Sequence, residues 1–408
     1  MLFRQRIFLL TLFLFFFLFS TFDIFLNFTI NDMNFRSFYI IEIILFCIFA
    51  KYYRMISRDF LWLVSWITIY IFLIIFFYDN KFLEILLLLW MIFSAAIVFI
   101  INKSQFLISM LSLYRVYIFS FFLIACLGLL QFCLSFFFSI DILITQKWGN
   151  GIPRINGFFY EPSFYGTYLF IGWSSLIYIF YKSLNPLIKH QNFYLLVISL
   201  AMILSSSRMT IIFMLLSIFY FFLLFSFGKI NRTKGFFTLI LIIISSFFFY
   251  YLYISSSVYI GGLGFEGVGS HSMDERLYQF YLTLDVFKNN FITGVGFYNL
   301  PLNIIEISEK FNCLTWKGCQ GMSIFIELFA ACGIFGSILI GFFIKIFLSK
   351  PVKSNENFMI ITNSLKFSLF LVLILLSFNQ NIFRPYLWIL IGFTYSFSHC
   401  SYKKNLIK

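Results

Sequence analysis

The stretch R-I-N-G-F-F-Y-E-P-S-F-Y-G, residues Arg154–Gly166, ends a polar loop and opens a long apolar run. Gly157 suits a turn, and Glu161 and Pro162 follow it. Proline is favoured at the first position of a helix, and an acidic residue beside it suits the positive end of the helix dipole. We therefore predict that a helix begins here at a membrane surface, with Arg154 just before it. Taken alone, the same spacing is somewhat more typical of a capped helix after an ordinary loop arginine.

Composition places the chain in a membrane. Of its 408 residues 62% are hydrophobic and only 11% are charged, and the mean hydropathy of +0.96 lies far outside the usage of soluble proteins. The net charge of +13 would suit nucleic acid, but most basic residues lie in short loops between apolar runs, where they act as topology signals. We therefore expect the lipid bilayer, and no nucleic acid, as a partner.

A helix needs about 20 apolar residues to cross a membrane, and the chain has about twelve such runs. They are too long for the strands of a barrel. The sequence therefore predicts an all-α integral membrane protein with one polytopic domain over residues 1–408 and about 12 transmembrane helices. The predicted spans are residues 7–30, 37–50, 60–78, 82–101, 113–140, 163–181, 192–204, 209–228, 236–254, 321–344, 358–378 and 385–399.

The basic residues also predict the orientation. With both termini in the cytoplasm, about eighteen Lys and Arg lie on the inner side, among them Arg115, Lys182 and Lys189, and ten lie on the outer side. This is the bias expected when positive charge is retained inside. Two loops then lie outside, at residues 141–162 and 255–320, the larger one between the ninth and tenth spans.

Topology does not explain four arginines on the outer side. Arg208 opens the eighth span and Arg384 directly precedes Pro385 at the start of the last, where the helix dipole opposes a cation. An anion between guanidinium and helix end removes this conflict, and both groups bind phosphate well. One such arginine alone is more simply explained by a carboxylate or by lipid phosphate. Together they favour a shared anionic ligand, bound by Arg154, Arg208, Arg276 and Arg384.

The larger outer loop contains H-S-M-D-E-R at His271–Arg276, followed by apolar residues at helical spacing up to Asn290. We expect this segment to form a helix that lies on the membrane surface. Cys313 and Cys319 lie further along the same loop. Their spacing is compatible with a disulfide in an oxidising compartment, and equally with two free thiols.

The order of these features resembles the O-antigen polymerase (Wzy) family, within the wider O-antigen ligase and polymerase superfamily. The resemblance covers about the second half of the chain, and it depends on the order of the motifs because each motif alone is weak. The motifs are R-I-N-G-F-F-Y-E-P-S at Arg154–Ser163, S-S-S-R at Ser205–Arg208, D-E-R at Asp274–Arg276 with G-V-G at Gly294–Gly296, and I-E-L-F-A-A-C-G-I-F-G at Ile326–Gly336.

The resemblance implies a GT-C-like membrane glycosyltransferase in the bacterial inner membrane, with its active site facing the periplasm. It implies that oligosaccharide repeat units carried on undecaprenyl diphosphate are joined, with a chain-length regulator protein as a partner. The reaction displaces a diphosphate from an anomeric carbon, so the enzyme must stabilise developing negative charge, which arginines and helix N-termini do without a metal. The chain has no acidic D-x-D motif, and we expect no metal and no cofactor.

A general base near the acceptor hydroxyl would accelerate the reaction by about 10²–10⁴-fold. Glu161 is the first candidate, although a helix-capping role explains it as well. The other candidates are His271, Asp274 and Glu275, and pairing with Arg276 is the simpler explanation for the two carboxylates. Three residues at the outer end of the eleventh span suit either sugar hydroxyls or a polar turn: Asn379, Gln380 and Asn381.

Two rival functions remain open. Ligases of the same superfamily place a functional His just before the span with the E…G-I-x-G pattern, where this chain has Cys319-Gln320-Gly321-Met322, so a polymerase is favoured over a ligase. A transporter of lipid-linked sugar would often have broken helices and charge inside the membrane. Here the six prolines fall in loops or at span ends and most charge lies at the outer rim, which ranks the transporter third.

Overall fold

The computed structural model describes residues 2–24, 27–30, 33–55, 60–147, 151–183, 186–226, 271–310, 323–349, 356–378 and 382–399. Helices follow the predicted apolar runs closely. The first half of the chain forms α1 (Leu2–Phe19), α2 (Phe38–Phe49), a 3₁₀ turn (Ala50–Met55), α3 (Leu61–Phe76), α4 (Lys81–Ser104), α5 (Met110–Phe138), α6 (Pro162–Lys182), α7 (Gln191–Leu204) and α8 (Arg208–Ser226). The second half forms α11 (His271–Asn289), α12 (Asn299–Lys310), α13 (Ile324–Cys332), a 3₁₀ turn (Gly333–Gly336), α14 (Ser337–Leu348), α15 (Glu356–Leu376) and α16 (Pro385–His399).

Among the described residues, four segments are long and apolar enough to cross a membrane, namely α4, α5, α13 with α14, and α15. The shorter apolar helices α3, α7 and α8 accompany them. The chain is therefore an α-helical, multi-pass membrane protein. The number of twelve spans stays a prediction, and the ninth predicted span, at residues 236–254, lies outside the described residues.

The structure corrects the first predicted span. α1 ends at Phe19, and the rest of the predicted first span contains a turn at Asp23 and the strand β1 (Asn27–Ile30), which pairs antiparallel with β2 (Met33–Arg36). A charged residue is costly inside a membrane, so the helix ends before Asp23. The tenth predicted span corresponds to the continuous apolar segment of α13 and α14, Ile324–Leu348. Within it, a left-handed φ of +59° at Gly333 ends α13.

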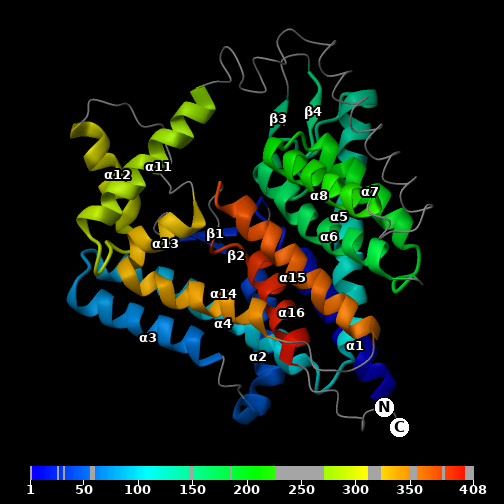
Figure 1. Ribbon diagram of the computed structural model, residues 1–408, viewed down its shortest axis with the longest axis horizontal. Helices are drawn as coiled ribbons and strands as arrows, with labels where there is room; N and C mark the ends of the chain where they lie inside the picture. Colours follow the sequence, from blue (N-terminus) through cyan, green and yellow to red (C-terminus); the bar gives the residue numbers. More distant parts are fainter. Residues whose placement is uncertain are drawn as a thin grey trace.

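The helices α6 and α16 form the centre of the molecule (Figure 1). Nearly every residue of α6 as far as Ile177, and of α16 as far as Ser398, is buried, as expected for helices that are enclosed on all sides. α6 packs against α15 and α7, and α16 packs against α4 and α15. The first turns of the two helices are neighbours, because the guanidinium carbon of Arg384 lies 3.9 Å from the centre of the Phe164 ring.

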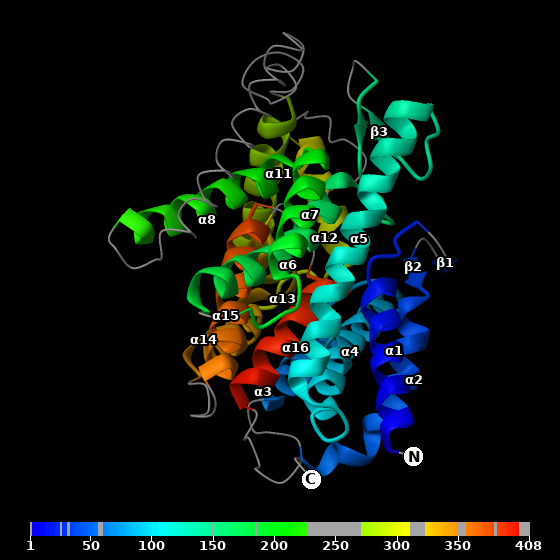
Figure 2. The same cartoon turned by 90° about the vertical axis from the view of Figure 1, so that its right-hand side faces the viewer.

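Figures 1 and 2 place the start of α1 and the end of α16 at the same end of the molecule. A short hairpin, β3 (Gln146–Lys147) with β4 (Pro153–Arg154), lies at the opposite end. This arrangement agrees with the sequence-based division of the loops into two sets. Which end faces the cytoplasm stays a prediction.

The helices α11, α12 and α13 form a smaller cluster beside the main bundle (Figure 1). Its separate apolar core consists of Leu282, Val286, Leu300, Ile304 and Ala330. The face of α11 predicted to contact the membrane surface carries Leu277 and Tyr281, whose exposed fractions are 47% and 59%. The described residues leave that face open, and its contact with a bilayer stays a prediction.

Candidate anion-binding site

The predicted helix start at the end of the Arg154–Gly166 stretch is confirmed. α6 begins at Pro162, and Glu161 takes the N-cap position in an extended conformation. The Glu161 carboxylate accepts a hydrogen bond from Ser163 Oγ at 3.0 Å, so it is held at the helix end. Its role as a general base stays a prediction.

The loop before α6 is fixed by a glycine turn. Gly157 adopts a left-handed φ of +57°, and a Cβ there would lie 2.9 Å from the Tyr165 ring, so a larger residue would be strained and crowded. The Gln131 side chain accepts from the Gly157 N–H at 2.8 Å and donates to its C=O at 2.9 Å. Arg154 is therefore carried on a loop with a defined path into α6.

Arg154 connects this loop to the start of α8. Its Nη1 donates to Gln146 Oε1 at 2.6 Å and its Nη2 donates to the Ser206 C=O at 3.3 Å. Ser206 belongs to the S-S-S-R motif and has a left-handed φ of +52°. Arg208 follows as the first residue of α8. The structure thus brings together two of the motifs and two of the predicted arginines.

The starts of α6 and α8 approach closely because Gly166 has no side chain. A Cβ at Gly166 would lie 2.7 Å from Thr210 Oγ1 and 2.9 Å from Ser207 Cβ. The two hydroxyls on α8 are themselves 2.8 Å apart. A larger residue at Gly166 would therefore separate the two helix ends that carry the arginines.

Arg384 joins the same region from the start of α16. Its Nη1 pairs with Asp23 Oδ2, and its guanidinium stacks on Phe164 in the first turn of α6. Asp23 Oδ1 also pairs with Arg36 Nη2 at 3.2 Å. The anion predicted beside Arg384 is thus at least in part a protein carboxylate, the simpler of the two explanations considered.

Asp23 and Arg36 are residues that sequence reasoning did not single out. The sequence does show that Asp23 interrupts the first apolar run and that Arg36 is one of the basic residues predicted on the outer side. Their meeting with Arg384 was not visible, because Arg384 lies 361 positions along the chain from Asp23. Two guanidinium groups share one carboxylate here, which leaves this cluster with a net positive charge.

The surroundings of Arg36 retain unused hydrogen-bond donors. Burial lowers the pKa of its guanidinium group, and the Asp23 carboxylate opposes that shift. Among the described residues, no acceptor reaches Arg36 Nη1, Tyr386 Oη or Trp90 Nε1. The Arg36 guanidinium carbon lies 5.8 Å from the centre of the Trp90 ring. Buried donors usually have acceptors, so this side of the cluster has capacity for an anion.

The remaining predicted residues are only partly described. His271, Asp274, Glu275 and Arg276 lie in the first turns of α11, but their side chains are outside the described part of the structure. The segment with Asn379, Gln380 and Asn381 and the pair Cys313 and Cys319 are outside it entirely. Their proposed roles stay predictions.

Two further motifs meet each other directly. The N–H of Val295 donates to the Ala330 C=O at 3.0 Å, and the N–H of Gly296 donates to the Ala331 C=O at 2.9 Å. Tyr78 Oη bridges the two segments by donating to the C=O groups of Thr293 and Ala331 at 2.7 and 2.8 Å. The G-V-G motif is therefore attached to the end of α13.

Glu84 in the first turn of α4 fixes the start of α12. Its buried carboxylate accepts hydrogen bonds from the N–H groups of Tyr298 and Asn299 at 3.0 and 3.2 Å, and from Tyr70 Oη. A carboxylate is favourable at a helix N-terminus. The outer-loop helices are thus anchored to the bundle through α4.

The described residues contain no group of His, Cys, Asp and Glu side chains that could hold a metal ion. Guanidinium groups lie near three helix N-termini in this region. Arg208 begins α8, Arg384 directly precedes α16 and contacts the first turn of α6, and Arg154 in β4 contacts the turn before α8. Such an arrangement suits phosphate groups.

The fold and this region define a multi-pass membrane protein with basic residues near the starts of α6, α8 and α16. Residues 193–341 match the family model described as O-antigen ligase (Wzy_C), so the chain carries a domain of the O-antigen ligase and polymerase family. Members of this family are membrane glycosyl-transferring enzymes that act on lipid-linked polysaccharide. A search of curated proteins gave no match.

The matched segment covers less than half of the chain. It begins in α7 and ends in α14, and it includes Arg208 and Arg276. Arg154 and Arg384 lie outside it. Arg154 contacts the turn before α8, which is part of the matched segment. Arg384 contacts the first turn of α6, which packs against α7 and α8.

Proposed function

We propose that this protein is an O-antigen polymerase, which joins undecaprenyl-diphosphate-linked repeat units at the periplasmic face of the bacterial inner membrane. The observation that carries the proposal is a pair of contacts beside a domain of this family. Arg154 contacts the S-S-S-R turn before α8, and Arg384 stacks on the first turn of α6, which packs against α8. An enzyme that expels a lipid diphosphate needs such a positively charged region.

The chemistry follows from the substrates. The hydroxyl oxygen of the acceptor sugar forms a bond with the anomeric carbon of the donor, and the bond from that carbon to the diphosphate oxygen breaks. Arg154, Arg208 and Arg276 are proposed to stabilise the departing diphosphate. Arg384 contributes in partnership with Asp23. Glu161 is the proposed acceptor of the hydroxyl proton.

The ligase is the second candidate, and the description of the matching family as O-antigen ligase favours it. The absence of a His in Cys319–Met322, where the ligases place theirs, favours the polymerase. The end of α13 at Gly333, within the segment of the tenth predicted span, is a feature that transporters also show. In this chain that helix end is packed against backbone, since a Cβ at Gly333 would lie 2.2 Å from the Ile292 C=O.

The test is deletion of the gene in its host, followed by gel analysis of the lipopolysaccharide. A polymerase deletion leaves lipid A core capped with a single repeat unit. Bare core with accumulated lipid-linked polymer would mean a ligase. Bare core with single lipid-linked units retained on the inner face would mean a transporter.

Complementation with variants tests the site itself. We expect Arg154→Ala to lose polymer, by about 10²-fold or more in rate, as when a transition-state donor is removed. Lys147→Ala is the matched control, because Lys147 lies on the same hairpin but pairs with Asp141 at an exposed position, and it should keep a normal ladder. If Arg154→Ala gave a normal ladder of polymer lengths, the Arg154–Gly166 stretch would mark the start of a helix and would have no role in the reaction.

A further inference from the structure

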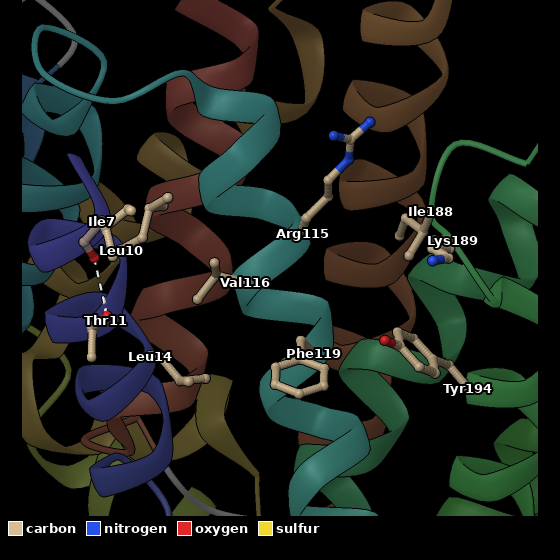
Figure 3. A pocket seen from close by; sticks show the side chains of 10 residues that line it. All are labelled: Ile7, Leu10, Thr11, Leu14, Arg115, Val116, Phe119, Ile188, Lys189 and Tyr194. Carbon is tan, nitrogen blue, oxygen red and sulfur yellow. Dashed lines mark hydrogen bonds between the residues drawn. The ribbon is translucent and has the colours of Figure 1, made fainter. Parts of the chain in front are cut away.

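A groove lies where α1, α5 and the start of α7 come together (Figure 3). Its volume is about 380 Å³, within the range of roughly 300–1,000 Å³ typical of ligand sites. The α5 residues Val116 and Phe119 form its floor, and α1 and the start of α7 form its walls.

The α1 wall is apolar and continuous. Ile7, Leu10, Thr11 and Leu14 follow one face of the helix and extend for roughly 10 Å along its axis. The only hydroxyl among them, on Thr11, donates to the Ile7 C=O at 3.0 Å, so no polar group on this wall requires a ligand hydrogen bond. The wall therefore suits a hydrocarbon chain.

One end of the groove is cationic. Arg115 and Lys189 lie at the end where Ile7 lies, away from Leu14 (Figure 3). Both side chains are exposed, and neither pairs with a carboxylate among the described residues. Lys189 directly precedes the start of α7, where His190 makes no side-chain cap, so the helix N-terminus adds to the positive potential.

We propose that this groove binds an anionic glycerophospholipid of the inner leaflet. An acyl chain lies along α1 and α5, and the phosphate lies between Arg115 and Lys189. Both basic residues belong to the set predicted on the cytoplasmic side, where anionic headgroups attract cations next to spanning helices. The site holds α1, α5 and α7 together from the lipid side, and it does not depend on the proposed polymerase reaction.

The test is native mass spectrometry of the full-length protein, released from detergent and titrated with phosphatidylglycerol or phosphatidylcholine. We expect the first phosphatidylglycerol to bind more tightly than phosphatidylcholine. Arg115→Ala and Lys189→Ala should each weaken it about fivefold, and the double variant roughly 25-fold, which corresponds to about 1 kcal/mol per basic residue. Leu14→Trp, which fills the groove without a change in charge, should also weaken the binding of phosphatidylglycerol.

Lys182→Ala is the matched control, because Lys182 is an exposed lysine of the same predicted side that does not line the groove, and it should bind as the parent does. Equal binding of the two lipids, or unchanged affinity in the double variant or in Leu14→Trp, would overturn the proposal. So would displacement of the lipid by inorganic phosphate alone, or tighter binding of undecaprenyl phosphate at this groove.

Discussion

Asp23 links the first hairpin of the chain to the start of the last helix, α16. Its carboxylate pairs with Arg36 and Arg384, and its side chain is only 6% exposed. Its backbone N–H also donates to the Phe158 C=O at 3.0 Å, in the stretch that opens α6. The carboxylate of Asp23 therefore positions the first hairpin and the start of α16, and its backbone N–H positions the loop before α6.

Removal of this carboxylate should destabilise the protein strongly. Asp23→Ala leaves two largely buried guanidinium groups without their anion, and breaking a buried pair typically costs about 3–5 kcal/mol. We expect a clear fall in the thermal midpoint of the protein purified in detergent.

The comparison for this measurement is Asp285→Ala. Asp285 pairs with Lys288 at 3.2 Å on an exposed face of α11, where such a pair contributes about 0–1 kcal/mol. If Asp23→Ala melted at the same temperature as Asp285→Ala, the cluster would have no structural role, and Arg36 and Arg384 would be held by other contacts.

At the scale of elements, the outer-loop helices depend on a contact between Gly296 and α4. Gly296 has a φ of +89°, and a Cβ there would lie 2.0 Å from Glu84 Oε1. The Glu84 carboxylate in turn holds the start of α12. A side chain at position 296 would push this carboxylate away from the helix that it caps.

We expect Gly296→Ala to release α11 and α12 from the bundle, seen as faster protease cleavage within residues 271–310. Gly151→Ala is the control, because Gly151 also has a positive φ, +76°, but no atom lies within 4 Å of the added Cβ. It therefore reports only the backbone strain, of roughly 1–2 kcal/mol. Equal cleavage in the two variants would mean that the Glu84 contact is not what anchors the loop.

At the scale of the whole molecule, the two ends of the bundle should face different compartments. The exposed residues Lys147 and Lys182 lie in the loop sets predicted outside and inside, respectively. In a background without native cysteines, we expect Lys147→Cys to react with a membrane-impermeant maleimide in intact spheroplasts. Lys182→Cys should react only after the membrane is opened. The reverse pattern would place the arginine site in the cytoplasm.

The sequence by itself determined the helices and the helix starts. Long apolar runs can satisfy their backbone in a membrane only as helices, so the observed bounds follow the predicted spans, and proline marks the first residue of α6 and of α16. Those are local effects. They failed at Asp23 in the first predicted span, where the chain turns and the carboxylate pairs with Arg36 and Arg384.

The tertiary structure decided which charges meet. Arg154 and Arg208 were visible as outer arginines, but only packing at Gly166 brings α6 and α8 together. Asp23 pairs with Arg384, 361 positions away, and Glu84 binds the start of α12, 214 positions away. The hydrophobic pattern of the sequence predicts each helix separately. A charge in a low-dielectric interior is stabilised by the partner that helix packing brings next to it, and that partner can come from anywhere in the chain.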